Sequence, residues 1–202
     1  DLSSDRSASM AGDPAKWQAL ADLTFAFSAW VRREGGVLRV LDAGGAVFDP
    51  AAFATSGETQ VTEQTSHPAP PVEALCPPTP LRPRGLRILV SDLLLEGDLG
   101  APLRRLAEGA AGTVVVQLLT PAELDPESAG PMTLIDAEAH TELDVLLDRR
   151  TIAQYIERLR RHRASVETHC QRLGVGYALV TAAAPSEMIR DDLMRQGVVE
   201  PA

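Results

Sequence analysis

Three oxygen-bearing side chains stand at alternate positions near the start of the chain. Asp5, Ser7 and Ser9 form an Asp-x-Ser-x-Ser pattern shortly before a helix start at Asp13 and Pro14. Because alternate residues of an extended or looped backbone face the same way, their oxygens can converge on one point. A hard divalent cation such as Mg²⁺ or Mn²⁺ takes oxygen ligands of this kind and keeps several waters. The pattern therefore predicts a metal site, although it is also compatible with a Ser-rich turn that caps a helix.

A second carboxylate, Asp92, follows the apolar run of residues 86–90. In open α/β sheets, ligands bind beyond the carboxyl ends of the parallel strands. Two loops at the same end of such a sheet would bring two carboxylates within reach of one cation. Zn²⁺ favours nitrogen and sulfur ligands, so an all-oxygen set should prefer Mg²⁺ or Mn²⁺. The side chains expected to converge are Asp5, Ser7, Ser9 and Asp92.

Apolar runs typical of buried strands alternate with stretches of helical periodicity. The expected elements are a helix from Asp13 to Gly35, a hairpin of residues 37–41 and 46–48, strands over 86–90, 113–119 and 175–180, helices over 102–109, 151–173 and 186–197, and a hairpin of 132–135 and 142–146. This order predicts an α/β fold with a doubly wound, mostly parallel central sheet, helices on both faces and an antiparallel hairpin addition. We expect one domain over residues 1–202, with an irregular Pro-rich insertion over residues 50–83.

Composition narrows the classes of partner. The chain has 202 residues, and 19 basic against 28 acidic side chains give a net charge of −9. An acidic chain without a basic run is a poor ligand for nucleic acid and for anionic membranes. Two distant cysteines, Cys76 and Cys170, favour a reducing compartment, so we expect this domain to be cytoplasmic. The sequence begins at Asp1 without Met, which predicts an N-terminally truncated fragment of a longer protein.

Residues 5–10 resemble the DxSxS motif of von Willebrand factor A-type domains, the first part of the metal-ion-dependent adhesion site. The whole chain more specifically resembles the bacterial family called domain of unknown function 58. The stretches that carry the resemblance are residues 5–10, 84–94, 118–124, 134–138, 155–159 with His162, and Cys170 with 174–177. Their order along the chain is more specific than any one of them.

This resemblance implies a von Willebrand factor A-like, metal-dependent protein-interaction module without catalysis of its own. The metal would be held by Asp5, Ser7 and Ser9, with Asp92 contributing directly or through water. A Thr from the loop before residues 86–90 would complete the set. Thr65 lies at the more familiar distance from Asp92 and is the preferred candidate, whereas Thr59 stands in the better local motif.

Relatives of this family are encoded with AAA+ ATPases of the MoxR type, which implies such an ATPase as partner. An open position on the Mg²⁺ or Mn²⁺ would accept a carboxylate from that partner. Full-length relatives often carry upstream membrane helices, so any membrane attachment is expected through a missing N-terminal segment.

Two other functions stay open at this point. A metal-dependent hydrolase could use Asp5 and Asp92, but it would need a general base or a second metal beside them. A degenerate scaffold could have lost the metal and kept only its surface. A zinc site on His162 and His169 is disfavoured, because seven residues separate them by about 10 Å along a helix. Neither a nucleophile elbow nor a P-loop pattern occurs.

Overall fold

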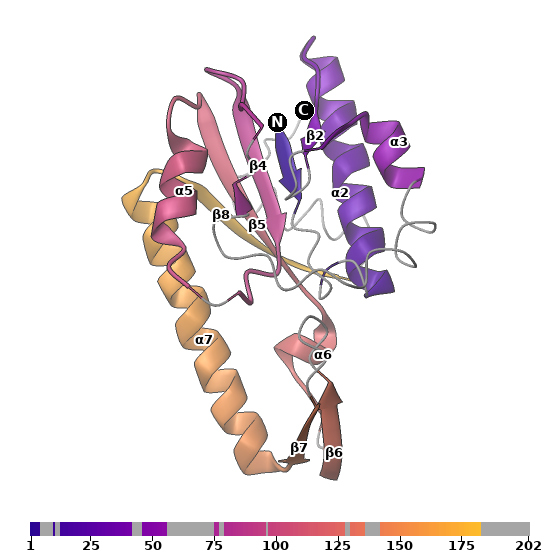
Figure 1. Cartoon of the computed structure of the whole chain (residues 1–202), viewed down its shortest axis with the longest axis vertical. Coiled ribbons are helices and arrows are strands. Elements are labelled where there is room, and N and C mark those ends of the chain that lie inside the picture. The colour runs from indigo at the N-terminus through magenta and orange to yellow at the C-terminus, as the bar shows by residue number, and fades with distance from the viewer. Residues whose placement is uncertain are drawn as a thin grey trace.

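A six-stranded sheet runs through the middle of the molecule (Figure 1). The computed structural model describes residues 1–4, 10, 13–41, 46–55, 75–76, 79–95, 97–127, 130–135 and 142–182. The strand order is β3-β2-β1-β4-β5-β8, and only β3 runs antiparallel to its neighbour. The strands are β1 (Leu2–Ser4), β2 (Val40–Leu41), β3 (Val47–Phe48), β4 (Leu86–Ser91), β5 (Gly112–Leu119) and β8 (Gly176–Thr181).

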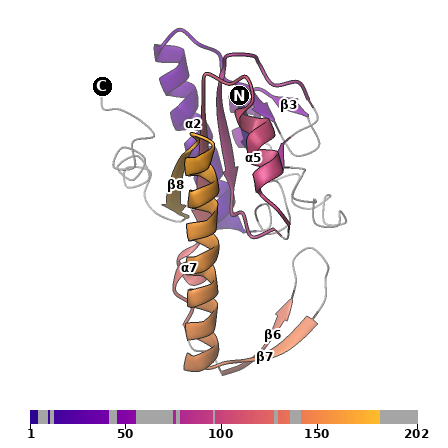
Figure 2. The same ribbon diagram turned by 90° about the vertical axis from the view of Figure 1, so that its left-hand side faces the viewer.

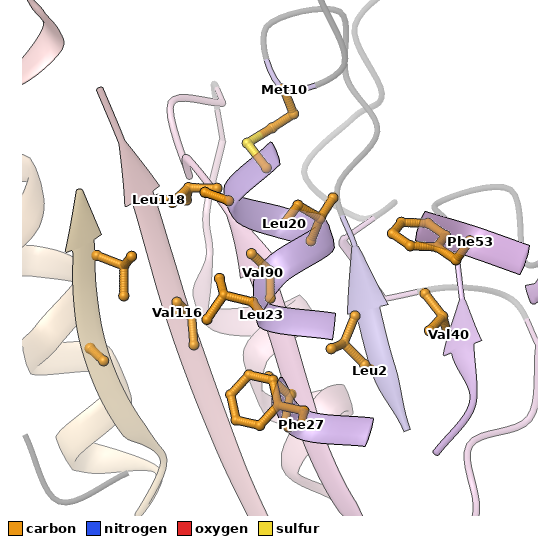
Figure 3. Close-up of a cluster of buried hydrophobic side chains, with 14 of the residues drawn as sticks. Leu2, Met10, Leu20, Leu23, Phe27, Val40, Phe53, Val90, Val116 and Leu118 are labelled. Carbon is orange, nitrogen blue, oxygen red and sulfur yellow. The ribbon is translucent and has the colours of Figure 1, made fainter. Parts of the chain in front are cut away.

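Helices cover both faces of this sheet. The helices are α2 (Pro14–Arg33), α3 (Pro50–Thr55), α5 (Gly100–Ala107) and α7 (Arg149–Arg172). On one face, Leu20, Leu23 and Phe27 of α2 pack with Val90 and Val116 of the sheet (Figure 3). On the other face, residues of α5 and α7 pack with Leu89 and Val115, the intervening strand residues. Adjacent residues of β4 and β5 therefore serve opposite cores, as a sheet buried on both sides requires.

The second sheet is a hairpin of β6 (Gly130–Ile135) and β7 (Glu142–Leu147), paired antiparallel. It contacts the first turns of α7, and Figure 2 shows α7 running past the large sheet to reach it. Leu143 and Leu146 of this hairpin are exposed. The predicted α/β architecture is thus confirmed: a doubly wound, mostly parallel sheet with helices on both faces and an antiparallel hairpin added.

Side-chain caps set where the helices begin. The Asp13 carboxylate accepts hydrogen bonds from the amides of Ala15 and Lys16, so α2 begins at Pro14 as the sequence predicts. The Asp148 carboxylate accepts a hydrogen bond from the Thr151 amide and so caps α7. These caps are local in sequence, which explains why both starts fall within two residues of their predicted places.

Two elements differ from the prediction. Residues 50–83 were expected to be irregular from their first residue, but Pro50 opens helix α3, whose Phe53 is fully buried against α2. Asp49 starts this helix, since its carboxylate accepts from the Ala51 amide. The first hairpin is shorter than expected, with only two residues in each of β2 and β3. The helix predicted over residues 186–197 lies outside the described residues.

Candidate functional site

The parallel strands β1, β4, β5 and β8 end on one side of the molecule, which we call the carboxyl end of the sheet. β1 and β4 are neighbours there, and Ser4 pairs with Val90. β1 therefore ends at Ser4 on the same side of the sheet where β4 ends, just before Asp92. Figure 1 shows the amino-terminal turn of α2 and helix α6 (Pro121–Leu124) at this end.

A buried lysine joins two carboxylates at the carboxyl end. The Lys16 Nζ lies 2.8 Å from Oδ2 of Asp92 and 2.7 Å from Oε1 of Glu123. Lys16 sits in the first turn of α2, Asp92 follows β4, and Glu123 belongs to α6, so three distant segments meet on one ammonium group. The side chains of Lys16 and Asp92 are 2% and 0% exposed, whereas that of Glu123 is 26% exposed. We call these three residues the lysine–carboxylate cluster.

The backbone after Asp92 makes a tight turn that orients its carboxylate. Oδ1 of Asp92 accepts a hydrogen bond from the Leu94 amide at 3.2 Å, and Ser91 Oγ accepts one from the Leu93 amide. Leu93 between them has a φ of 57°, a left-handed conformation that a bulky residue rarely adopts. The Leu93 carbonyl lies 2.8 Å from Nε2 of His162 on α7. Strain of this kind persists only where the surroundings hold the backbone in place.

Glu123 is oriented by its own helix cap. Its Oε2 accepts hydrogen bonds from the Thr120 amide and hydroxyl, while the Thr120 Oγ1 accepts one from the Glu123 amide. This is a capping box, and it leaves Oε1 directed at Lys16. The Tyr155 hydroxyl donates to the Glu123 carbonyl and so ties α6 to α7.

Charge in the cluster is set by the two carboxylates. Burial alone would lower the pKa of Lys16, but the Asp92 charge and the hydrogen bonds to Asp92 and Glu123 outweigh it and raise the pKa above its usual value. Lys16 is thus a permanent cation at neutral pH. With two carboxylates and one ammonium, the cluster has a formal charge of −1.

Asp92 is the one predicted metal ligand that the structure describes. Asp5, Ser7, Ser9 and Thr65, together with the alternative Thr59, lie outside the described residues. Asp92 sits at the carboxyl end of the sheet, next to the strand that leads into residue 5, as expected from the sequence. The convergence of the full set remains a prediction.

Asp92 fits a metal in donor type but is already engaged with a cation. Carboxylate oxygen is the ligand that Mg²⁺ takes, and neither the Leu94 amide nor Lys16 uses every lone pair of Asp92. However, Oδ2 is bound to an ammonium, and a second cation nearby would be repelled by it. Within the described ranges, no group of three or more His, Cys, Asp or Glu side chains could hold a metal ion.

The sequence reasoning missed Lys16 and Glu123. One signal for Lys16 was available: it is the single lysine of the chain, and it falls on the same helical stripe as Leu20, Thr24 and Phe27, which are buried. A charge on a buried stripe demands a partner. Nothing in the sequence marks Glu123 as that partner, because the two are 107 residues apart.

The remaining candidates have structural partners. His162 bonds to the Leu93 carbonyl, and Nδ1 of His169 lies 2.8 Å from the Ser165 carbonyl one turn earlier on the same helix. Cys76 and Cys170 are both buried and unpaired with one another. Burial raises the pKa of the Cys170 thiol to about 11, which makes it a poor nucleophile.

Comparisons with known proteins now bear on this geometry. Residues 69–165 match the model of the family described as "Protein of unknown function DUF58", a stretch that contains Asp92 and Glu123. The predicted resemblance to this family is thus confirmed over these residues. The solved structure of a conserved hypothetical protein, BatB, from Bacteroides thetaiotaomicron is similar at a TM-score of 0.48 and 14% identity, over 98% of each chain. The curated proteins gave no match.

The DUF58 match covers β4 and β5 of the six-stranded sheet, but it contains neither β8 nor the Asp-x-Ser-x-Ser segment. The lysine–carboxylate cluster therefore joins a residue outside the matched stretch, Lys16, to two residues inside it. A search of the described residues for a helix long and apolar enough to cross a membrane found none.

Proposed function

We propose that this DUF58 chain is a non-enzymatic protein-interaction module whose docking point is the carboxyl end of the sheet. The observation that carries the proposal is the pairing of β1 with β4. Because Ser4 lies opposite Val90, β1 and β4 end side by side, and the Asp-x-Ser-x-Ser segment follows Ser4 in the sequence as Asp92 follows β4. This end is where open α/β sheets bind their ligands.

The proposed module is metal-dependent, with Mg²⁺ or Mn²⁺ as its ion. Asp5, Ser7 and Ser9 would hold the ion, with Asp92 and Thr65 as further oxygen ligands. Bound there, the ion would offer a position to a carboxylate from the partner. On a chain of net charge −9, such a cation would be the attractive point for an acidic group.

The proposed partner is an AAA+ ATPase of the MoxR type, and the proposed place of action is the cytoplasm. The ATPase follows from the resemblance to DUF58 proteins, and the compartment from two unpaired, buried cysteines.

Several contacts favour interaction over catalysis. The described polar side chains nearest Asp92 are engaged in internal hydrogen bonds: Ser91 Oγ accepts from the Leu93 amide, and Gln117 donates to the Asp92 carbonyl. Gln117 in turn accepts from the Tyr177 hydroxyl. Side chains held by such internal hydrogen bonds make this end of the sheet a rigid surface.

The test is binding of a purified MoxR-type ATPase to the immobilised chain. Mg²⁺ is kept constant, because removing it with a chelator would also affect the ATPase. Asp5→Ala is expected to lose ATPase binding and to lose the gain in melting temperature that Mg²⁺ gives, as linkage requires. Its melting temperature without metal should be unchanged or slightly raised, since one repelling carboxylate is gone.

Arg160→Ala is the matched control, because Arg160 lies on the exposed face of α7 and its side chain is 73% exposed. It should bind the ATPase like the unaltered chain. The proposal is wrong if Asp5→Ala binds the ATPase normally or unfolds outright. It is also wrong if the chain shows metal-dependent hydrolysis that Asp92→Ala abolishes.

A further inference from the structure

The carboxylates of the lysine–carboxylate cluster are oriented by groups other than Lys16. Asp92 is held by the Leu94 amide through Oδ1, and Glu123 is held by the Thr120 amide and hydroxyl through Oε2. The oxygens that face Lys16 are therefore directed to a common point by contacts on their far sides. Two carboxylates held in this way are a preformed binding site for a cation.

The residue that fills this point is unusual for this chain. Of its 19 basic residues, 18 are arginines and Lys16 is the single lysine. A guanidinium is a planar fork suited to one carboxylate, whereas an ammonium is a compact point charge that can bind several oxygens around it. Lys16 thus carries the one ammonium side chain of the sequence. Like a metal ion, this ammonium is a compact positive charge that can bind several oxygens.

The cluster also has a route to solvent. Asp92 is fully buried, but the Glu123 side chain is 26% exposed, so the carboxylate pair is open on the Glu123 side. An ion from solvent would therefore approach the cluster from the side of Glu123. The residual formal charge of −1 favours such an approach, and the ammonium opposes it.

We propose that the Lys16 ammonium is the resident cation of the carboxyl end of the sheet and competes with divalent ions for Asp92 and Glu123. The inference rests on the proposed function, because it concerns the same end of the sheet. It adds that Lys16 lowers the affinity of Asp92 for a divalent ion. Removing the ammonium would create a divalent site made by Asp92 and Glu123.

The test measures Mn²⁺ binding by calorimetry in the unaltered chain, Lys16→Met and Lys16→Gln. Gln keeps a hydrogen-bond donor but carries no charge, so it separates the charge from the contact. Both variants are expected to bind Mn²⁺ roughly tenfold or more tightly than the unaltered chain, since one positive charge beside the ion is removed. Adding Asp92→Asn to either variant should abolish the gain.

A Lys16 variant that does not fold in the absence of metal still tests the inference. Circular dichroism with and without Mn²⁺ then decides, because an ion that replaces the ammonium should restore the fold. Equal Mn²⁺ affinity in the unaltered chain, Lys16→Met and Lys16→Gln overturns the inference. It is also overturned if Lys16→Gln with Asp92→Asn binds Mn²⁺ as tightly as Lys16→Gln does. Failure to fold even with Mn²⁺ also overturns it.

Asp5→Ala in the Lys16→Gln background separates this inference from the proposed function. If the gain persists there, Lys16 is the competing cation at Asp92 and Glu123 independently of the Asp-x-Ser-x-Ser set. If the unaltered chain binds the ATPase without any contribution from Asp5, the proposed metal dependence fails while the inference on Lys16 stands.

Discussion

A charged side chain is buried at each end of strand β4. One is bound by backbone carbonyls and the other by side chains. At its amino end, Arg87 is 5% exposed, and its guanidinium donates to the backbone carbonyls of Leu106 and Glu108 at 2.7 Å each and of Arg82 at 3.2 Å. At its carboxyl end, Asp92 is fully buried and bound by the side chain of Lys16, which also binds Glu123.

This difference separates a charge bound by backbone carbonyls from a charge bound by other side chains. Leu106 and Glu108 lie at the end of α5, where carbonyls have no partner within the helix, so Arg87 caps that helix. Backbone carbonyls of a helix end cannot leave to bind something else. Side-chain carboxylates can exchange one cation for another, and the proposed binding at the carboxyl end depends on this property.

The largest expected effect comes from Lys16→Met. It leaves Asp92 buried without its counter-charge, so the free energy of unfolding should fall by about 3–5 kcal/mol. Urea denaturation at pH 7 measures it. Lys16→Met with Asp92→Asn should recover most of this loss, because the charge left without its partner, that of Glu123, is partly exposed to water. Arg160→Met, on an exposed side chain, should change stability by less than about 0.5 kcal/mol. If Lys16→Met lowers the free energy of unfolding by less than about 1 kcal/mol, Lys16 and Asp92 are not a tightly coupled pair.

Arg87→Met should cost less, about 2–3 kcal/mol, because it removes hydrogen bonds to neutral carbonyls and leaves no charge behind. The same urea titration measures it. The comparison predicts that Mn²⁺ restores stability to Lys16→Met and leaves Arg87→Met unchanged. Equal rescue of both variants would break the distinction between the two ends of β4.

Thr120→Ala tests how Glu123 is oriented. The substitution removes the hydroxyl of the capping box, so stability should fall by about 1 kcal/mol. Thr120→Ser keeps the hydroxyl and is the control, expected near the unaltered value. If Thr120→Ala has no effect on thermal denaturation, α6 is held by its contacts with Tyr155 and Lys16 rather than by the capping box.

Glu123→Gln should have the smallest effect, about 0.5 kcal/mol, because Glu123 is partly exposed and water screens its charge. Gln can still accept from Thr120, so the capping box survives. Denaturation at low and at high salt is the measurement, and the small loss should shrink as salt rises. A loss as large as that of Lys16→Met would mean that Glu123, rather than Asp92, is the main partner of the ammonium.

Local patterns predicted most of the fold. Asp13 and Pro14 mark the start of α2, apolar runs mark β4 and β5, and the β6–β7 hairpin follows from two short strand-like stretches. Each of these signals depends on residues close together in the chain, which is why sequence spacing captures them. The place of Asp92 at the end of β4 followed from the same reasoning.

Other features depended on contacts that spacing does not encode. Helix α3 was missed because its burial depends on Phe53 reaching Trp17 of α2, where the two rings lie 5.3 Å apart. β1 has a single apolar residue, Leu2, yet lies between β2 and β4 because both neighbours supply its backbone partners.

By itself, the sequence determined the α/β pattern, the resemblance to DUF58 and the presence of acidic and hydroxyl side chains on either side of a single lysine. Only the tertiary structure decided which charges neutralise one another. Lys16 meets Asp92 across 76 residues and Glu123 across 107, because parallel strands and a helix start bring those segments to one end of the sheet. A buried charge must find a partner wherever the fold supplies one, and that choice is made by packing rather than by distance along the chain.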